Sequence, residues 1–131
     1  MARLLIVEDD SDARDLISMR LVMVGHRVVA SPNAAWALDT VERVGAPDAY
    51  VLDIGLPDID GFELLDRLRD AADPEIPAIF LTALSDAANV ARGRALGAQY
   101  LTKPFMVNNL IRAVDAAVAA APPVDSMSHY W

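Results

Sequence analysis

Residues 50–61 read Tyr-Val-Leu-Asp-Ile-Gly-Leu-Pro-Asp-Ile-Asp-Gly, a short apolar run that ends on a carboxylate and continues into turn residues. Apolar runs of this length, bounded by turn signals, are typical of strands buried in a parallel sheet. The stretch therefore predicts a strand over Ala49–Leu52 whose carboxyl end presents Asp53. The Gly, Pro and Asp residues that follow predict a loop over Ile54–Asp60.

Three other apolar runs end on polar residues in the same way. They are Arg3–Val7 before Glu8, Asp9 and Asp10, Ile76–Leu81 before Thr82, and Gln99–Thr102 before Lys103. In a parallel α/β sheet, residues just past the carboxyl ends of neighbouring strands gather in one crevice. The crevice would combine acids, a hydroxyl and an ammonium group, which is a suitable site for a hard cation and a phosphoryl group.

Helical periodicity alternates with these runs and with a further strand predicted over His26–Ala30. The predicted helices are Asp12–Val24 after a cap at Asp10 or Ser11, a segment from the Asn33 cap to Gly45, a segment after Gly61, a segment from a Ser85 cap to Gly97, and a segment starting near Val107. Five βα units with short loops predict a doubly wound, flavodoxin-like α/β fold. It would have a five-stranded parallel sheet of order 2-1-3-4-5 and helices on both faces. This order places Asp9 beside Asp53.

Size and composition fit one globular domain. The chain has 131 residues, of which 54% are hydrophobic and 23% charged. We expect a single domain over residues 1–121 and a short tail over 122–131, which begins at a proline pair. The net charge of -8 disfavours direct nucleic-acid binding and a membrane-surface role. There is no cysteine and no apolar run of about 18 residues. We therefore expect a cytoplasmic location.

Three carboxylates in one crevice repel one another and raise one another's pKa unless a cation neutralises them. Glu8, Asp9 and Asp53 would be such a set, and their hard oxygen atoms suit Mg²⁺. Asp53 is the candidate nucleophile for a phosphoryl group. Thr82 could donate a hydrogen bond to the phosphoryl oxygens, and Lys103, the only lysine of the chain, could supply positive charge.

In these features the chain resembles the receiver domain of two-component response regulators. The resemblance covers roughly residues 3–119 and rests on Glu8-Asp9, on the stretch from Asp53 to Gly61, on Thr82-Ala83, and on residues 97–105 around Lys103-Pro104. It implies that Asp53 accepts a phosphoryl group from a histidine kinase or a histidine phosphotransfer protein. It also implies a cis peptide bond between Lys103 and Pro104.

The resemblance further implies the role of each site residue. Asp9, Asp53 and the backbone carbonyl of Gly55 would bind Mg²⁺, with Glu8 assisting through water. Thr82 and Lys103 would contact the phosphoryl oxygens. Tyr100 would be the switch aromatic residue, which turns inward as Thr82 shifts.

The expected function is a stand-alone, phosphorylation-activated signalling switch of a two-component or phosphorelay system, without its own output domain. We do not expect it to be an enzyme beyond its own phosphorylation and dephosphorylation. It would signal by protein contact through the surface formed by the predicted helix Ser85–Gly97, the strand Gln99–Thr102 and the last helix. It would be a monomer or a weak, phosphorylation-dependent dimer.

Other functions remain open. The chain could be the N-terminal receiver fragment of a larger regulator with a DNA-binding or enzymatic output domain. A magnesium-dependent phosphohydrolase with an aspartyl nucleophile is a further alternative, although Gly55 occupies the position where such enzymes usually carry a second acid. A metal-dependent nucleic-acid catalytic domain is disfavoured by the net charge of -8.

Overall fold

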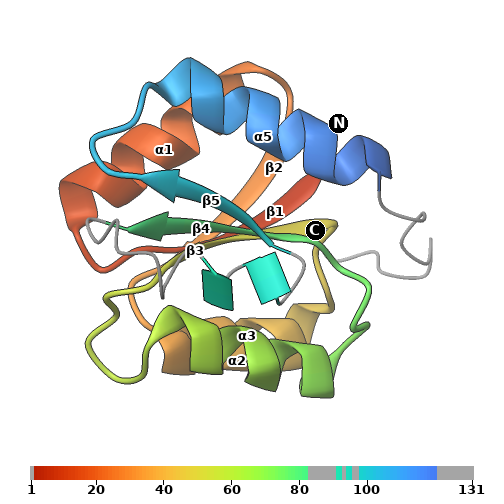
Figure 1. The fold of residues 1–131 in the computed structure, drawn as a ribbon. Coiled ribbons are helices and arrows are strands. Elements are labelled where there is room, and N and C mark those ends of the chain that lie inside the picture. Colours follow the sequence, from red (N-terminus) through yellow and green to blue (C-terminus); the bar gives the residue numbers. More distant parts are fainter. Residues whose placement is uncertain (1, 83–90, 93, 96–97, 121–131) are drawn as a thin grey trace.

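A computed structural model of the chain describes residues 2–82, 91–92, 94–95 and 98–120 (Figure 1). It contains a five-stranded parallel sheet of order β2-β1-β3-β4-β5, which confirms the predicted order. The strands are β1 (Arg3–Val7), β2 (Arg27–Ser31), β3 (Ala49–Asp53), β4 (Ala78–Thr82) and β5 (Gln99–Thr102). The fold is therefore the doubly wound, flavodoxin-like α/β type that the sequence predicted.

Burial explains why the central strands are continuous apolar runs. Every residue of β3 and β4 is buried, whereas the edge strands β2 and β5 are partly exposed. A strand covered by helices on both faces has no solvent side, so polar residues appear only at its ends. The polar residues at the carboxyl ends of β1, β3 and β4 therefore stand out in the sequence and indicate where the crevice lies.

Two strands start later than predicted. The amide of His26 donates to the carbonyl of Leu21 at the end of the preceding helix, so β2 starts at Arg27. The strand β4 starts at Ala78, because the residue before it, Pro77, has no amide hydrogen to give to a neighbouring strand.

The helices cover both faces of the sheet (Figure 1). Helices α1 (Ser11–Met23) and α5 (Val107–Ala120) lie on one face, and α2 (Ala34–Val44) and α3 (Gly61–Ala71) lie on the other. Each face has its own apolar cluster, and alternate residues of each buried strand contribute to one cluster or the other. The sheet and the helices α1, α2, α3 and α5 thus hold the strand ends in fixed places.

The predicted helix over Ser85–Gly97 lies partly outside the described residues. Residues 91–92 and 94–95 are helical, and Arg92 places its guanidinium carbon 4.4 Å from the ring centroid of Phe62 in α3. The Phe62 ring in turn lies 4.6 Å from that of Phe80 in β4. The predicted cap at Ser85 and the predicted tail over 122–131 fall outside the described part of the chain.

Side-chain caps define where the helices begin. Asp10, Asn33 and Asp60 each accept a hydrogen bond from an amide of the first turn of α1, α2 and α3 respectively. Helix α2 has a second cap from a distant loop. The carboxylate of Asp58 accepts from the amides of Ala34 at 3.1 Å and Ala35 at 2.9 Å. This bond ties the loop after β3 to the start of α2.

Gly61 allows the start of α3 to pack directly against the end of β3. Its amide donates to the carbonyl of Ile54 at 3.0 Å. A Cβ atom at position 61 would lie 2.5 Å from the backbone oxygen of Asp53 and 2.9 Å from the Cα of Ile54. Both atoms belong to the backbone, so they cannot move aside without shifting the strand end.

We therefore expect Gly61→Ala to destabilise the protein by about 1–3 kcal/mol, the usual cost of overpacking. Gly55 is the matched control, because among the described residues a Cβ there would meet only Asp53 Oδ1 at 3.8 Å, an ordinary contact. Gly55→Ala is expected to change stability by less than about 0.5 kcal/mol. Urea unfolding of both variants measures the difference, and equal midpoints would contradict the close approach at Gly61.

Candidate functional site

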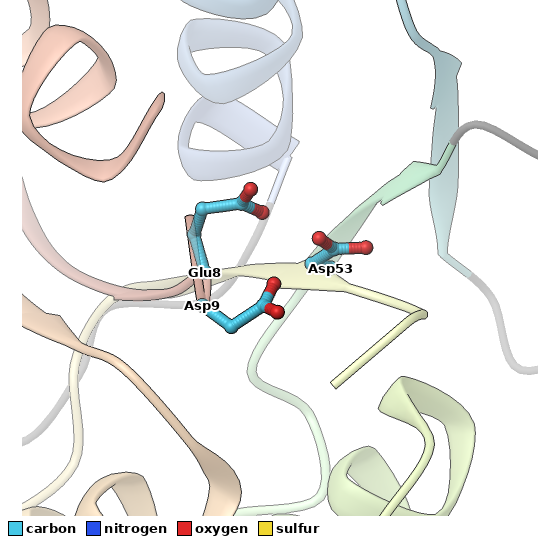
Figure 2. A group of neighbouring side chains, drawn as sticks. All are labelled: Glu8, Asp9 and Asp53. Atoms are coloured by element: carbon cyan, nitrogen blue, oxygen red, sulfur yellow. The ribbon is translucent and has the colours of Figure 1, made fainter. Parts of the chain in front are cut away.

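Three carboxylates converge at the carboxyl ends of β1 and β3. The two strands are parallel neighbours, with Val7 opposite Leu52, so Glu8 and Asp9 follow β1 at the level of Asp53. Each of the three offers a carboxylate oxygen, and these oxygens lie within 4.8 Å of one another (Figure 2). Glu8 and Asp53 are buried, whereas Asp9 is exposed. The predicted juxtaposition of Asp9 and Asp53 is confirmed.

Lys103 enters the same crevice from the end of β5. Its Nζ donates to Glu8 Oε1 at 2.9 Å and to Asp53 Oδ2 at 3.1 Å. Its backbone amide donates to the carbonyl of Thr82 at 2.6 Å. This hydrogen bond fixes the position of the Lys103 backbone at the end of β5. The Lys103–Pro104 peptide bond is cis, as predicted.

Asp53 is held at both carboxylate oxygens. Besides the bond from Lys103, Oδ1 accepts the amide hydrogen of Gly55 at 2.9 Å. Burial raises the pKa of Asp53, but the hydrogen bonds with Glu8, Gly55 and Lys103 outweigh it, so the pKa lies below its usual value. Asp53 is therefore ionised near neutral pH.

Glu8 behaves in the opposite way. Burial, followed by its hydrogen bond to Asp53, raises the pKa of Glu8 to about 7, although Lys103 acts against the shift. Below about pH 7 and without a metal, Glu8 therefore holds a proton that it can share with Asp53. One ammonium group is not enough to neutralise three carboxylates at this site.

The donor set fits a hard divalent cation. When Glu8 is ionised, its buried Oε2 has no hydrogen-bond partner among the described residues. A proton or a cation would satisfy this oxygen, and a cation would also offset the mutual repulsion of the three acids. The cluster offers only carboxylate oxygens, without His or Cys, and oxygen ligands of this kind suit Mg²⁺.

The structure places the remaining predicted residues around this group. Thr82 is buried at the end of β4, one residue beyond Leu81, the partner of Asp53 in the sheet register. Tyr100 is half-buried in β5 opposite Phe80 and packs against the apolar cluster on the α2–α3 face. The roles predicted for the Thr82 hydroxyl, the Tyr100 ring and the Gly55 carbonyl stay predictions.

Arg14 was not identified from the sequence. Its Nη1 donates to the backbone carbonyl of Glu8 at 3.0 Å and lies 3.4 Å from that of Asp9. Arg14 follows the cap Asp10 by four residues, so its side chain rises from the first turn of α1 back toward the end of β1. An arginine four residues after the capping Asp10, which itself follows the acidic pair Glu8-Asp9, is the sequence signal that could have identified it.

The raised pKa of Glu8 predicts a pH-dependent stability of the metal-free protein. Its folded pKa of about 7 exceeds the ordinary value of 4.5, so between these values the folded state binds more protons than the unfolded state. Stability should therefore fall as pH rises from about 5 to about 8, by on the order of 1–3 kcal/mol. The lowered pKa of Asp53 acts only at lower pH.

The variant Glu8→Gln mimics the protonated side chain, because its amide can donate to Asp53. In the presence of a chelator, Glu8→Gln should be more stable than the wild type at about pH 8, and its free energy of unfolding should depend less on pH. Glu63→Gln, an exposed change in the pair with Arg67, is the matched control and should keep the wild-type slope. A wild-type profile that is flat between about pH 5 and 8 would be inconsistent with the shared proton.

Comparison with known proteins identifies the family. The family model described as "Response regulator receiver domain" matches residues 4–115. The chain is 41% identical over 122 residues to the "Uncharacterized 14.6 kDa protein in sodA1 3'region" of Leptolyngbya boryana. This match covers 92% of this chain and 92% of that protein. It is 37% identical over 118 residues to RpaA of Synechocystis, a DNA-binding dual master transcriptional regulator, covering 88% of this chain and 48% of RpaA.

A solved structure agrees. The non-phosphorylated receiver domain of HemR from Leptospira biflexa matches with a TM-score of 0.83 at 29% identity, covering 95% of this chain and 100% of that one. The chain spans about half the length of most curated relatives that it matches. Within the described ranges, no helix has the length and apolar character needed to cross a membrane. The chain belongs to the response regulator receiver domain family, whose members act as phosphorylation switches of two-component systems.

Proposed function

We propose that this chain accepts a phosphoryl group on Asp53 from the phosphohistidine of a histidine kinase or phosphotransfer protein. The observation that carries the proposal is the geometry of Asp53. Its ionised carboxylate is held by the Gly55 amide and the Lys103 ammonium beside two further acids. A carboxylate is a weak nucleophile, and such a setting orients it toward a phosphorus atom.

The transfer forms one bond and breaks one. An Asp53 carboxylate oxygen attacks phosphorus, the phosphorus–nitrogen bond of the phosphohistidine breaks, and the electron pair leaves with the imidazole. The Lys103 ammonium and the Thr82 hydroxyl would receive the phosphoryl oxygens. Mg²⁺, held by Asp9, Asp53 and the Gly55 carbonyl with Glu8 assisting through water, would neutralise these oxygens and hold the phosphoryl group in line.

A pocket beside this group offers a place for the phosphodonor to dock. It measures about 520 Å³ and is lined by Asp10, Ala13, Leu16, Ile17, Lys103, Pro104, Phe105 and Val107. The adjacent surface of α1 exposes Leu16, Met19 and Met23. An apolar surface next to Lys103 would let a donor helix bind while its phosphohistidine reaches Asp53.

The test is transfer to the wild-type protein. Incubation with a phosphohistidine donor or acetyl phosphate and Mg²⁺ should add one phosphoryl group per chain by intact-mass spectrometry. A chelator should prevent the reaction, and hydroxylamine should remove the group because it cleaves acyl phosphates. Metal-independent labelling would contradict the proposal, and sustained turnover of phosphate esters would favour the phosphohydrolase alternative.

We also propose that the phosphorylated form signals through β5, α5 and the helical residues around Arg92. Phosphate at Asp53 would attract the Thr82 hydroxyl, and Tyr100 would turn inward into the space released. Packed elements with two arrangements can transmit such a local change to a distant face. Arg92, Arg94 and Arg112 are exposed on or near this surface and would make it less acidic than the protein as a whole.

Tyr100→Ala should uncouple the switch from phosphorylation. Labelling of Asp53 is expected to stay within about threefold of the wild type, because Tyr100 lies outside the acid cluster. The change in amide hydrogen exchange that phosphorylation causes in β5 and α5 should largely disappear. Tyr100→Phe, which keeps the ring, is the control and should retain most of that change. An undiminished response in Tyr100→Ala would exclude Tyr100 as the switch.

A further inference from the structure

The guanidinium group of Arg14 forms hydrogen bonds to the backbone of the segment between β1 and α1. The backbone amide of Arg14 donates to the carbonyl of Asp10 at 2.9 Å within the helix. Its Nη1 reaches back across the first turn to the carbonyls of Glu8, at 3.0 Å, and Asp9, at 3.4 Å. The side chain is half-buried. Arg14 thus contacts the backbone of the two acids that β1 delivers to the crevice.

The helix dipole alone does not favour a cation at the position of Arg14. The amino-terminal end of a helix carries partial positive charge, so acidic side chains are favoured there and basic ones are not. Among the described residues, the ammonium that pairs with the site carboxylates is that of Lys103, whereas Arg14 bonds to peptide carbonyls. The contact therefore concerns the shape of the segment more than the charge of the carboxylates.

The segment needs to be held because Glu8 and Asp9 are consecutive. In an extended strand, successive side chains and successive carbonyls point to opposite sides. Here both carboxylates reach one cluster with Asp53, so the backbone must turn between them. One nitrogen atom within 3.4 Å of both carbonyls holds them on the same side. The amide of Glu8 is held separately by the carbonyl of Ser31 at 3.0 Å.

We infer that Arg14 is a positioning residue for the metal ligands, acting through the backbone of Glu8 and Asp9. The inference rests on the proposed function, since it concerns the same site. Without the guanidinium, the two carbonyls lose their shared donor and the carboxylates sample arrangements in which they no longer converge. Metal binding then has to reorder the segment, which weakens affinity without removing a ligand.

The experiment compares Arg14→Met, Arg14→Lys and Arg20→Met. Calorimetric titration should show Mg²⁺ affinity about tenfold weaker in Arg14→Met, in the range seen when partners of metal ligands are removed. Arg14→Lys keeps the charge, but its side chain is one bond shorter and does not reach the position of Nη1, so Mg²⁺ affinity should be weakened nearly as much. Arg20→Met removes the same charge further along α1 and should bind Mg²⁺ as the wild type does.

Two further measurements separate positioning from a general structural effect. In acetyl phosphate labelling, the half-saturating Mg²⁺ concentration of Arg14→Met should rise about tenfold, while the rate at saturating Mg²⁺ stays within about threefold. In the metal-free protein, the amides of Glu8, Asp9 and Asp10 should exchange hydrogen at least about tenfold faster, with the amides of β1 unchanged. This last readout requires neither metal nor phosphodonor.

The outcomes distinguish the two proposals. If wild-type protein neither binds Mg²⁺ nor becomes labelled, the proposed function fails, whereas the exchange result still tests the positioning of the segment. If the wild type does both and Arg14→Met binds Mg²⁺ equally well or more tightly, the role of Arg14 is overturned. Wild-type affinity in Arg14→Lys would likewise overturn it, because charge alone would then suffice.

Discussion

Asp53→Asn is expected to abolish phosphoryl transfer to the protein, by at least about three orders of magnitude. The amide has no anionic oxygen to attack phosphorus and cannot form the acyl phosphate. The side chain is nearly isosteric, and its amide oxygen can still accept from Gly55 or Lys103, so the fold should be preserved. Because the amide loses the charge that these hydrogen bonds stabilise, we also expect a somewhat lower unfolding temperature without metal.

Intact-mass spectrometry after incubation with a phosphodonor and Mg²⁺ measures this effect. Asp10→Asn is the matched control, because it removes an acid at the mouth of the same site while asparagine remains a good cap for α1. The control should be labelled at nearly the wild-type rate. Labelling of Asp53→Asn at the wild-type rate would show that another residue is the acceptor.

Asp9→Ala is expected to have the second largest effect, on metal affinity. Asp9 is the exposed carboxylate of the cluster, so it can bind a cation without a large cost of desolvation. Its loss should weaken Mg²⁺ binding by about 100-fold. Glu8→Ala should weaken binding less, by about tenfold, because Glu8 Oε1 already accepts a hydrogen bond from Lys103 and we propose that Glu8 contacts the metal only through water.

Calorimetric titration with Mg²⁺ of the two variants and the wild type gives the ranking directly. Asp9→Ala should unfold no more easily than the wild type in a chelator, so weakened binding cannot be attributed to unfolding. An Mg²⁺ titration unchanged in Asp9→Ala would refute its assignment as a ligand. If Glu8→Ala weakened Mg²⁺ binding more than Asp9→Ala, Glu8 would be the stronger ligand. Its carboxylate would then have to break its hydrogen bond with Lys103 in order to bind the metal.

The strands and their order could be predicted because burial on both faces leaves a simple pattern. In β3 every residue from Ala49 to Leu52 is apolar or aromatic and buried, so the first carboxylate, at Asp53, marks the end of the apolar run. Short connections and the handedness of crossovers then restrict the strand order to few choices. The approach of Asp9 to Asp53 follows from that order alone.

The contacts of polar side chains could not be predicted in the same way. Lys103 and Glu8 are separated by 95 positions, and nothing local to either indicates that the lysine pairs with the buried acid. The need for glycine at position 61 depends on how closely α3 approaches β3, a distance that no pattern of residues encodes. Hydrophobic periodicity fixes which faces pack, whereas a polar side chain has many possible partners until the fold is formed.

The hydrogen bonds that the amides of Ala34 and Ala35 donate to Asp58 bear on how this domain could be recombined with its relatives. The loop after β3 and the start of α2 are distant in the chain but share one carboxylate. A chimera that exchanges α2 alone would give Asp58 a foreign helix start, with amides in a different position. Such an exchange should transfer the loop over Ile54–Asp60 together with α2, so that both sides of the bond come from one parent.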